Sequence, residues 1–182
     1  MRTDSERALR TRRLVIELLL ARSPEAEVLR EYARRFGVAE RRFRTETTDD
    51  CILCGLCVRV CSELIGAHAI SFVSRGVDRE VETAFRKESE ECTGCGACAA
   101  VCPTGAITVE DIEEVRRLER WHTTVELACC PACGERFAPA RQVASIAEKD
   151  VPVEDWLYLC PQCRRKLLGR NLTWARAGKA GR

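Results

Sequence analysis

Apolar residues are most concentrated near the N-terminus, in a run that a single charged residue interrupts. This run, Leu14–Leu20, contains Glu17 as its only polar residue, and several arginines precede it. Such a density of apolar side chains indicates a helix, over about residues 7–21, that is mostly buried against another part of the protein or against a partner.

A second helix is predicted directly after the first. Ser23-Pro24-Glu25 is typical of a helix start, with serine as the N-cap, proline at the first helical position and an acid in the first turn. Apolar residues recur at helical spacing over Val28–Phe36, and Gly37 follows where a helix would end. We therefore expect a helix over 24–36 that pairs with the first as a docking hairpin within residues 1–48, because two such helices bury too little apolar surface to be stable alone.

Short apolar runs in the middle of the chain predict β-strands. Ala69–Val73 and Val81–Phe85 resemble two strands around a turn at Gly76, and Ala106–Val109 resembles another strand. Both groups follow a cysteine-rich segment. Residues 49–109 therefore indicate an internal repeat, in which each half consists of a cysteine loop, a short helix and a strand.

The C-terminal part of the chain is predicted to contain two further helices and a tail. Three apolar residues at intervals of three in a charged segment predict a helical spacer over 110–124. They are Ile112, Val115 and Leu118. A second helix is expected near 139–148, within a module over residues 125–169. The basic tail, residues 170–182, is expected to be disordered from Arg170 onwards.

The composition is rich in cysteine and poor in aromatic residues. Of the 182 residues, 13 are cysteine and only 5% are aromatic. The hydrophobic fraction of 46% includes those cysteines, so we expect small modules rather than one large core. No export signal is evident, and no apolar run approaches the roughly 18 residues of a membrane span. We therefore expect a cytoplasmic protein whose thiols bind metal instead of forming disulfides.

The small net charge of +2 hides an uneven distribution. Basic residues are in excess in residues 1–48 and 164–182, whereas acidic residues dominate between them. Thiolates bound to metal add negative charge, so the cysteine-bearing part of the loaded protein should be strongly acidic. The basic C-terminal residues favour a solvated arm or a contact with an acidic partner over nucleic-acid binding.

Eight cysteines form two runs with the same spacing, Cys-x2-Cys-x2-Cys-x3-Cys. Three thiolates on a tight loop can reach three corners of one iron–sulfur cube, whereas the fourth, one helical turn further on, points away and serves another cube. Two zinc sites are the alternative, but zinc sites use cysteines in pairs. The first run consists of Cys51, Cys54, Cys57 and Cys61, and the second of Cys92, Cys95, Cys98 and Cys102.

This spacing resembles that of bacterial two-cluster ferredoxins, and the pattern implies which cysteines share a cluster. Each cluster takes the first three cysteines of one run and the fourth cysteine of the other. Cluster one is assigned to Cys51, Cys54, Cys57 and Cys102. Cluster two is assigned to Cys92, Cys95, Cys98 and Cys61. We therefore expect two [4Fe-4S] clusters and an oxygen-sensitive protein.

A third group of cysteines forms two Cys-Pro-x-Cys turns. Paired turns of this kind make a four-sulfur site that suits zinc, and their sequence resembles zinc-ribbon tails on some hydrogenase-type iron–sulfur subunits. A third cubane, a mononuclear iron and two metal-free thiol pairs are the alternatives. The expected ligands are Cys130, Cys133, Cys160 and Cys163. Cys129 is the expected spare thiol, because Pro131 of the turn follows Cys130.

Residues 49–109 resemble the two-cluster ferredoxin domain of the large iron–sulfur subunit of respiratory NADH dehydrogenase, of iron-only hydrogenases and of NAD-linked formate dehydrogenases. The resemblance rests on Cys51–Cys61, on Cys92–Ala106 and, upstream, on Arg13–Ala21. In those families the upstream segment continues into a cluster site of one histidine and three cysteines. Here residues 22–36 contain neither residue type, so that cluster is expected to be absent, as is the N-terminal two-iron domain.

The resemblance implies an electron relay and not a catalyst. The implied role is to pass single low-potential electrons between a larger catalytic subunit and a second redox carrier or flavoprotein subunit. The catalytic subunit would be a hydrogenase, a formate dehydrogenase, or a molybdenum or tungsten enzyme such as a benzoyl-CoA reductase. The competing hypothesis is a metal-stapled adaptor or redox-sensing module, linked to nucleic acid, whose clusters are structural.

The sequence as a whole predicts an α+β protein. Its expected parts are an N-terminal helical hairpin, a bacterial two-cluster ferredoxin-like domain and a C-terminal zinc-ribbon-like module. Neither a dinucleotide fingerprint, a phosphate loop nor a nucleophile–base set is evident in the sequence, which is consistent with a relay.

Overall fold

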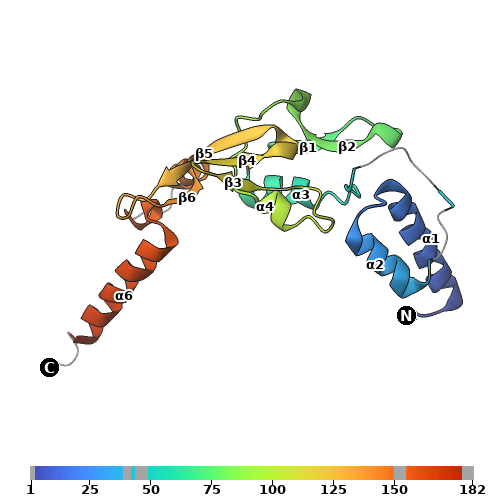
Figure 1. Ribbon diagram of the computed structural model, residues 1–182, viewed down its shortest axis with the longest axis horizontal. Coiled ribbons are helices and arrows are strands. Elements are labelled where there is room, and N and C mark those ends of the chain that lie inside the picture. The colour runs from blue at the N-terminus through green and yellow to red at the C-terminus, as the bar shows by residue number, and fades with distance from the viewer. Residues whose placement is uncertain (1–2, 39–41, 44–48, 150–154, 178–182) are drawn as a thin grey trace. The chain divides into compact units, whose positions relative to one another are not determined.

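The computed structural model of the chain describes residues 3–38, 42–43, 49–149 and 155–177. Figure 1 shows its helices and strands. The chain forms two compact units. Unit 1 comprises Met1–Phe85 and Gly96–Thr108, and unit 2 comprises Arg86–Cys95 and Val109–Arg182. The second cysteine run is therefore divided, because its first two cysteines belong to unit 2 and its last two to unit 1.

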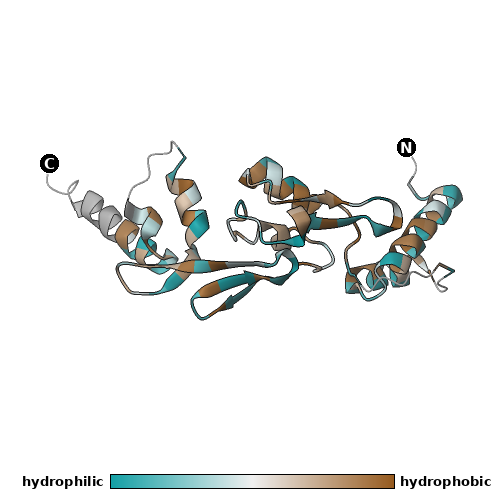
Figure 2. Cartoon of the chain, turned by 90° about the horizontal axis from the view of Figure 1, so that it is seen from above, coloured by the Kyte–Doolittle hydropathy of each residue, from teal (hydrophilic) through white to brown (hydrophobic). Residues whose placement is uncertain are grey.

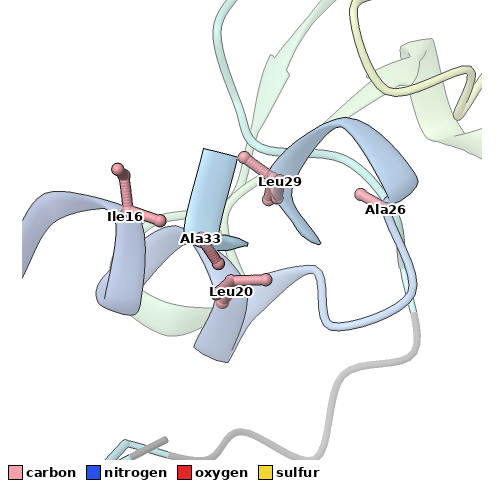
Figure 3. Packing of buried hydrophobic residues seen from close by; sticks show 5 residues of the cluster. All are labelled: Ile16, Leu20, Ala26, Leu29 and Ala33. Carbon is pink, nitrogen blue, oxygen red and sulfur yellow. The ribbon is translucent and has the colours of Figure 1, made fainter. Parts of the chain in front are cut away.

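Unit 1 begins with two helices that pack against each other. They are α1 (Glu6–Arg22) and α2 (Glu27–Phe36). Hydrophobic and hydrophilic residues are interspersed along α1 (Figure 2), which lets one side of the helix be buried while the other is exposed. Figure 3 shows the core between the helices, which consists of Ile16, Leu20, Ala26, Leu29 and Ala33.

The second helix begins three residues later than the sequence predicts. Ser23 ends α1 and donates its hydroxyl hydrogen to the carbonyl oxygen of Asp49 (3.2 Å) instead of capping α2. The helix begins at Glu27, after Ala26, whose carbonyl accepts the N–H of Arg30. The predicted start at residue 24 is therefore wrong, because the predicted cap residue has a partner elsewhere in unit 1.

Short helices in unit 1 carry cysteines of both runs. α3 (Leu56–Arg59) leads directly into a π-helical turn, η1 (Val60–Ile65), and α4 (Ala97–Ala100) contacts both of them. Each of α3 and α4 follows a glycine in the left-handed conformation. The expected repeat of a cysteine loop followed by a short helix is thus present in both halves.

The strands of unit 1 form one antiparallel pair. β1 (Ile70–Val73) pairs with β2 (Glu80–Thr83), and the 3-10 turns η2 (Gly76–Asp78) and η3 (Ala84–Arg86) flank β2. The predicted strand at Ala106–Val109 is wrong. That segment is a loop, and its apolar pattern reflects the burial of Ile107 rather than pairing with another strand.

Unit 2 is built on a four-stranded antiparallel sheet in the order β3-β4-β5-β6 (Figure 1). The strands are β3 (Glu110–Ile112), β4 (Val115–Leu118), β5 (Thr123–Cys129) and β6 (Arg136–Pro139). The 3-10 turn η4 (Glu119–Trp121) connects β4 to β5. Alternate residues of β5 are buried, and α5 (Ala140–Ala147) packs on this strand.

The helical spacer predicted over 110–124 is wrong. The segment forms β3 and β4, joined by a two-residue turn in which Glu113 has a φ of 52°. The intervals of three between its apolar residues fit one face of a helix. As a strand, however, β4 pairs with β5 and still buries Leu118, which is 1% exposed. Backbone pairing with a neighbouring strand thus overrides a local helical pattern.

The C-terminal segment is helical where the sequence predicts disorder. η5 (Asp155–Tyr158) precedes α6 (Pro161–Ala177), so the tail is a helix from Arg170 as far as Ala177. The helix begins in the second Cys-Pro-x-Cys turn, whose proline is suited to a first helical position. Residues 178–182, also predicted to be disordered, lie outside the described residues. No helix in the described part of the chain is long and apolar enough to cross a membrane.

Candidate metal centres

The first two cysteines of run one lie on a tight loop that leads into α3, and the third lies in the first turn of that helix. Gly55, with a φ of 74°, turns the chain into the helix, and a Cβ atom there would lie 3.0 Å from the ring of Phe72. The position therefore requires glycine. At the start of the loop, the Cys51 N–H donates to Asp49 Oδ1 (3.1 Å), and the Cys51 carbonyl accepts from Arg22 Nε (3.0 Å).

Cys57 is buried in α3 near other thiols. Burial raises the pKa of its thiol to about 11, although the N–H of Val58 acts in the opposite direction. Negative charge on Cys51, Cys54 or Cys98 raises this pKa further. The Cys57 thiol thus resists ionisation in the presence of three neighbouring thiols of unit 1, a condition that a bound cationic centre relieves. The donor set fits a thiolate-bound iron–sulfur centre.

Cys102, the last cysteine of run two, has several hydrogen-bond donors around its sulfur. Its Sγ lies 3.6 Å from Thr104 Oγ1. Burial raises the pKa of the Cys102 thiol, but hydrogen bonds from the Thr104 hydroxyl and from the amides of Thr104, Gly105 and Ala106 outweigh burial and lower it. Hydrogen-bond donors around a sulfur stabilise its thiolate form, which is the form that binds a metal centre.

The first two cysteines of run two, Cys92 and Cys95, lie on a loop that packs on the sheet of unit 2. Gly94 has a φ of 71°, and a Cβ atom there would lie 3.1 Å from Val125 Cγ2 and 3.3 Å from Pro139 Cβ. The backbone of the loop therefore packs directly on the sheet at Gly94, where a larger residue would be crowded. Cys92 is buried, whereas Cys95 is partly exposed.

Two arginines of unit 2 bind backbone carbonyls of this loop. Arg116 Nη1 donates to the Gly94 carbonyl (3.4 Å), and Arg141 Nη1 donates to the Cys92 carbonyl (3.5 Å). Arg141 also pairs with Glu88 (2.9 Å) at the beginning of the segment. Neither arginine is evident from the sequence, because no fixed spacing relates them to the cysteines whose loop they support.

The two remaining cysteines of the runs lie on short helices of unit 1. Cys61 is half-buried in η1, and Cys98 is buried in α4. The two elements contact each other. All four residues assigned to cluster one are in unit 1.

The structure brings the four expected ligands of the third site together. Their sulfurs lie within 4.8 Å of one another, and Cys133 Sγ is 3.6 Å from Cys160 Sγ. A tetrahedral zinc site with Zn–S bonds of about 2.3 Å places its sulfurs roughly 3.8 Å apart, which is the scale observed. The four residues are Cys130, Cys133, Cys160 and Cys163.

Backbone N–H groups of both Cys-Pro-x-Cys turns point towards these sulfurs. Cys163 N–H donates to Cys160 Sγ (3.5 Å). The pKa of Cys130 is lowered to about 6, first by the Cys160 amide and, against burial, by the amides of Ala132 and Cys133. Hydrogen bonds with the Cys133 and Cys160 thiols, and then burial, raise the pKa of Cys163 to about 12. Full ionisation of the group therefore requires a cation.

Cys129 lies outside this group. Its thiol is exposed and donates to the Gly134 carbonyl (3.4 Å). Cys130, the next residue, is 1% exposed and is one of the four clustered sulfurs. In extended chain, neighbouring side chains point in opposite directions, so only one of two adjacent cysteines reaches the site.

Comparison with known families identifies the domain that contains the two cysteine runs. Residues 50–106 match the family described as the 4Fe-4S dicluster domain. All eight cysteines of the two runs fall within this range. The chain thus binds 4Fe-4S clusters through the segment whose cysteine spacing predicts them.

Two large oxidoreductase subunits are similar to much of the chain. The NADP-reducing hydrogenase subunit HndD of Solidesulfovibrio fructosivorans is 35% identical over 134 residues, which cover 59% of this chain and 23% of the relative. An NADH-quinone oxidoreductase subunit of Rhizobium meliloti (strain 1021) is 30% identical over 161 residues, which cover 74% of this chain and 18% of the relative. The chain therefore spans about a fifth of the length of these relatives.

A small ferredoxin matches over most of its own length. Ferredoxin-3 of Nostoc sp. (strain PCC 7120 / SAG 25.82 / UTEX 2576) is 35% identical over 72 residues, which cover 36% of this chain and 74% of the relative. This similarity agrees with the domain match and with the two equally spaced cysteine runs. The chain therefore belongs to the family of iron–sulfur proteins that carry a 4Fe-4S dicluster domain.

Proposed function

We propose that this chain relays single low-potential electrons as the iron–sulfur subunit of a multi-subunit oxidoreductase. The pair of cysteine runs within a 4Fe-4S dicluster domain is the observation that carries this proposal. Thiolate-bound cubanes supply one-electron redox chemistry when bound. The chain itself is a relay and turns over no substrate.

The proposal keeps the crossed assignment of ligands that the spacing implies. Each cluster takes three cysteines from one loop and one from the end of the other run. Cluster one takes Cys51, Cys54, Cys57 and Cys102. Cluster two takes Cys92, Cys95, Cys98 and Cys61. Negative charge on Cys51 or Cys54 raises the pKa of Cys57, which is consistent with a shared site for run one, although Cys98 has the same effect.

The polypeptide contributes to the relay by holding the thiolates, donating hydrogen bonds to sulfur and excluding water. Donors from Thr104 to Ala106 stabilise negative charge on the sulfur of Cys102. Burial of Cys57 and Cys98 has the opposite effect, because it removes water from the charged ligands. The balance between such hydrogen bonds and burial sets the potential at which an electron is accepted.

The third cysteine group is proposed to hold one structural zinc ion. Sulfurs as close as 3.6 Å suit four ligands around a single ion. A cubane binds its four thiolates to four different iron atoms, and it therefore needs sulfurs further apart. Because all four positions around the ion are protein sulfur, the site is closed and structural. A mononuclear iron ion needs the same four-sulfur geometry as zinc. Geometry therefore does not separate the two metals, and metal analysis is needed to distinguish them.

The proposed partners are a larger catalytic subunit and a second redox carrier or flavoprotein subunit, in the cytoplasm. The similar proteins are named as subunits of an NADP-reducing hydrogenase and of an NADH-quinone oxidoreductase. We propose that the catalytic subunit docks on the N-terminal helices of this chain. Leu14, Val15 and Leu18 of α1 are 40%, 48% and 48% exposed, respectively, opposite the core shared with α2.

Metal analysis and voltammetry of the anaerobically purified protein test this proposal. We expect about eight iron atoms and about one zinc ion per chain, with reversible one-electron reduction at strongly negative potential. About twelve iron atoms without zinc would refute the zinc assignment and indicate a third cubane. A redox-silent protein with salt-dependent nucleic-acid binding would contradict the relay and favour the adaptor.

A further inference from the structure

One face of the sheet in unit 2 lies against the second cysteine loop (Cys92–Cys95). Val125 of β5 and Pro139 of β6 approach Gly94 so closely that a Cβ atom on this glycine would lie 3.1 Å from Val125. Arg116 of β4 is directly opposite Val125 in the ladder, so its side chain emerges on the same face of the sheet. The surface that supports the loop therefore carries a guanidinium at this position.

The guanidinium of Arg116 is held between the loop and an acidic residue. Its Nη1 donates to the Gly94 carbonyl (3.4 Å), while its Nε and Nη2 donate to the carboxylate of Asp111 (2.6 and 2.8 Å). The side chain is only 18% exposed. Hydrogen bonds to Asp111 raise the pKa of Arg116 against burial, and the negative charges of Asp111 and Cys95 raise it further. A permanent cation thus lies within electrostatic reach of the Cys95 sulfur.

The first cysteine loop has a different charge at its start. There the N–H of Cys51 donates to the carboxylate of Asp49 (3.1 Å), which places a negative group beside a cluster-one ligand. Arg22 donates to the carbonyl of the first cysteine in loop one, and Arg141 donates to that of the first cysteine in loop two. The two loops are therefore alike in having one arginine at this carbonyl. The second loop therefore has a guanidinium beside it, with Asp111 as its counter-ion, where the first loop has the carboxylate of Asp49.

The charge near a cluster matters because reduction changes the charge of the cluster itself. One electron from a partner, or from dithionite in vitro, enters the cubane; no bond forms or breaks, and the cluster with its thiolates becomes more negative by one charge. A nearby cation stabilises this reduced state, particularly where water is partly excluded, and a nearby carboxylate destabilises it.

We infer that Arg116 is a positioning residue that raises the reduction potential of cluster two, so that the first electron accepted by the protein resides on that cluster. Unit 2, which lies mostly outside the dicluster domain, would then determine the order in which the clusters are reduced. This inference rests on the proposed function, because it requires two redox-active clusters with the proposed ligands.

Potentiometric titration of the anaerobically purified full chain, followed by electron paramagnetic resonance, tests the inference. In Arg116→Gln, the equilibrium constant for reducing one cluster should fall about tenfold, which corresponds to about 59 mV for a one-electron couple. The other cluster should keep its potential. Asp111→Asn should shift the same cluster in the opposite direction, because the guanidinium then has no neutralising carboxylate at this contact.

Arg117→Gln provides the matched control. Arg117 is the next residue of β4, so its side chain lies on the opposite face of the sheet, and it is exposed. This substitution removes the same charge and should move neither potential. Cys95→Ser and Cys54→Ser identify the signals, since each alters the cluster held by its own loop. The signal altered by Cys95→Ser should be the one that Arg116→Gln shifts.

The possible results separate the inference from the proposed function. Unchanged potentials of both clusters in Arg116→Gln would overturn the inference and leave the relay intact. If Arg116→Gln instead loses iron, the test rests on Asp111→Asn, because this variant keeps the arginine. A higher potential of cluster two in Asp111→Asn supports the inference, and an unchanged potential contradicts it. A wild-type protein whose clusters cannot be reduced would refute the proposed function itself.

Discussion

Two glycines determine how closely each cysteine loop approaches its support. Gly55 lies against Phe72 in unit 1, and Gly94 lies against Val125 in unit 2, both with positive φ. A methyl group at these positions would meet its neighbour at 3.0 and 3.1 Å, respectively, and would strain the backbone. The spacing of the cysteines supplies three proposed ligands from each run, and these small residues let each loop pack in its observed conformation.

The adjacent residues Cys129 and Cys130 form a matched pair for testing the third site. Cys130→Ser should remove nearly all of the bound zinc and lower the thermal unfolding midpoint, because a structural zinc ion contributes directly to folding. Cys129→Ser should retain about one zinc ion per chain, since its thiol contacts the Gly134 carbonyl outside the site. Zinc content and calorimetry measure both effects. Loss of zinc from Cys129→Ser alone would contradict the assignment.

The cysteines could be identified from the sequence, whereas the residues that support their loops could not. The spacing of the cysteines is a local pattern, and Pro131 favours Cys130 over Cys129, which agrees with the four sulfurs that lie together. Arg22, Arg116 and Arg141 reach their carbonyls from between 22 and 49 residues away along the chain. Contacts over such distances depend on the tertiary fold and produce no local pattern.

At the scale of elements, helical periodicity was informative only where neighbouring strands did not compete. The dense apolar run located α1 to within one residue at either end, and a helix was expected near 139–148, where α5 lies, without a periodic pattern. Helical periodicity located the end of α2 but not its start. It failed over 110–124, where three apolar residues fit a helix but β5 offers an unpaired edge to β4. The choice between helix and strand there depends on a partner that follows later in the chain.

A buried carboxylate on α1 makes the stability of unit 1 depend on pH. Glu17 is 6% exposed and accepts hydrogen bonds from the backbone N–H (2.9 Å) and the guanidinium (2.6–3.1 Å) of Arg42. The guanidinium first, and then the amide, lower the pKa of Glu17 against the effect of burial. Because the pKa is lower in the folded state, this stabilisation is present above about pH 4.3, the unfolded value, and is lost as the pH falls through the folded pKa.

Glu17→Gln should therefore lower the thermal unfolding midpoint at pH 7, and its difference from the wild type should shrink as the pH falls below about 4.3. Anaerobic circular dichroism melts between about pH 7 and pH 3 measure this trend. Glu31→Gln removes the same charge from an exposed position of α2 and should have little effect. A difference for Glu17→Gln that stays constant into acid would show that the ion pair is not its source.

At the scale of the whole molecule, metal centres take the place of a large hydrophobic core. Only 5% of the residues are aromatic, and each unit has a small apolar core together with at least one group of cysteines. Metal-bound thiolates also change the electrostatics, because the formal net charge of +2 counts every thiol as neutral. The loaded protein should thus have an acidic, cysteine-bearing body between basic terminal segments.

The number of electrons that the chain accepts tests the relay most directly. Anaerobic reductive titration of the full-length protein, monitored by electron paramagnetic resonance, should show uptake of about two electrons per chain, one for each [4Fe-4S] cluster. Reoxidation should restore the starting spectrum without loss of iron, and the proposed zinc site should take no part. Uptake of no electrons, or reduction that destroys the clusters, would contradict an electron-transfer function.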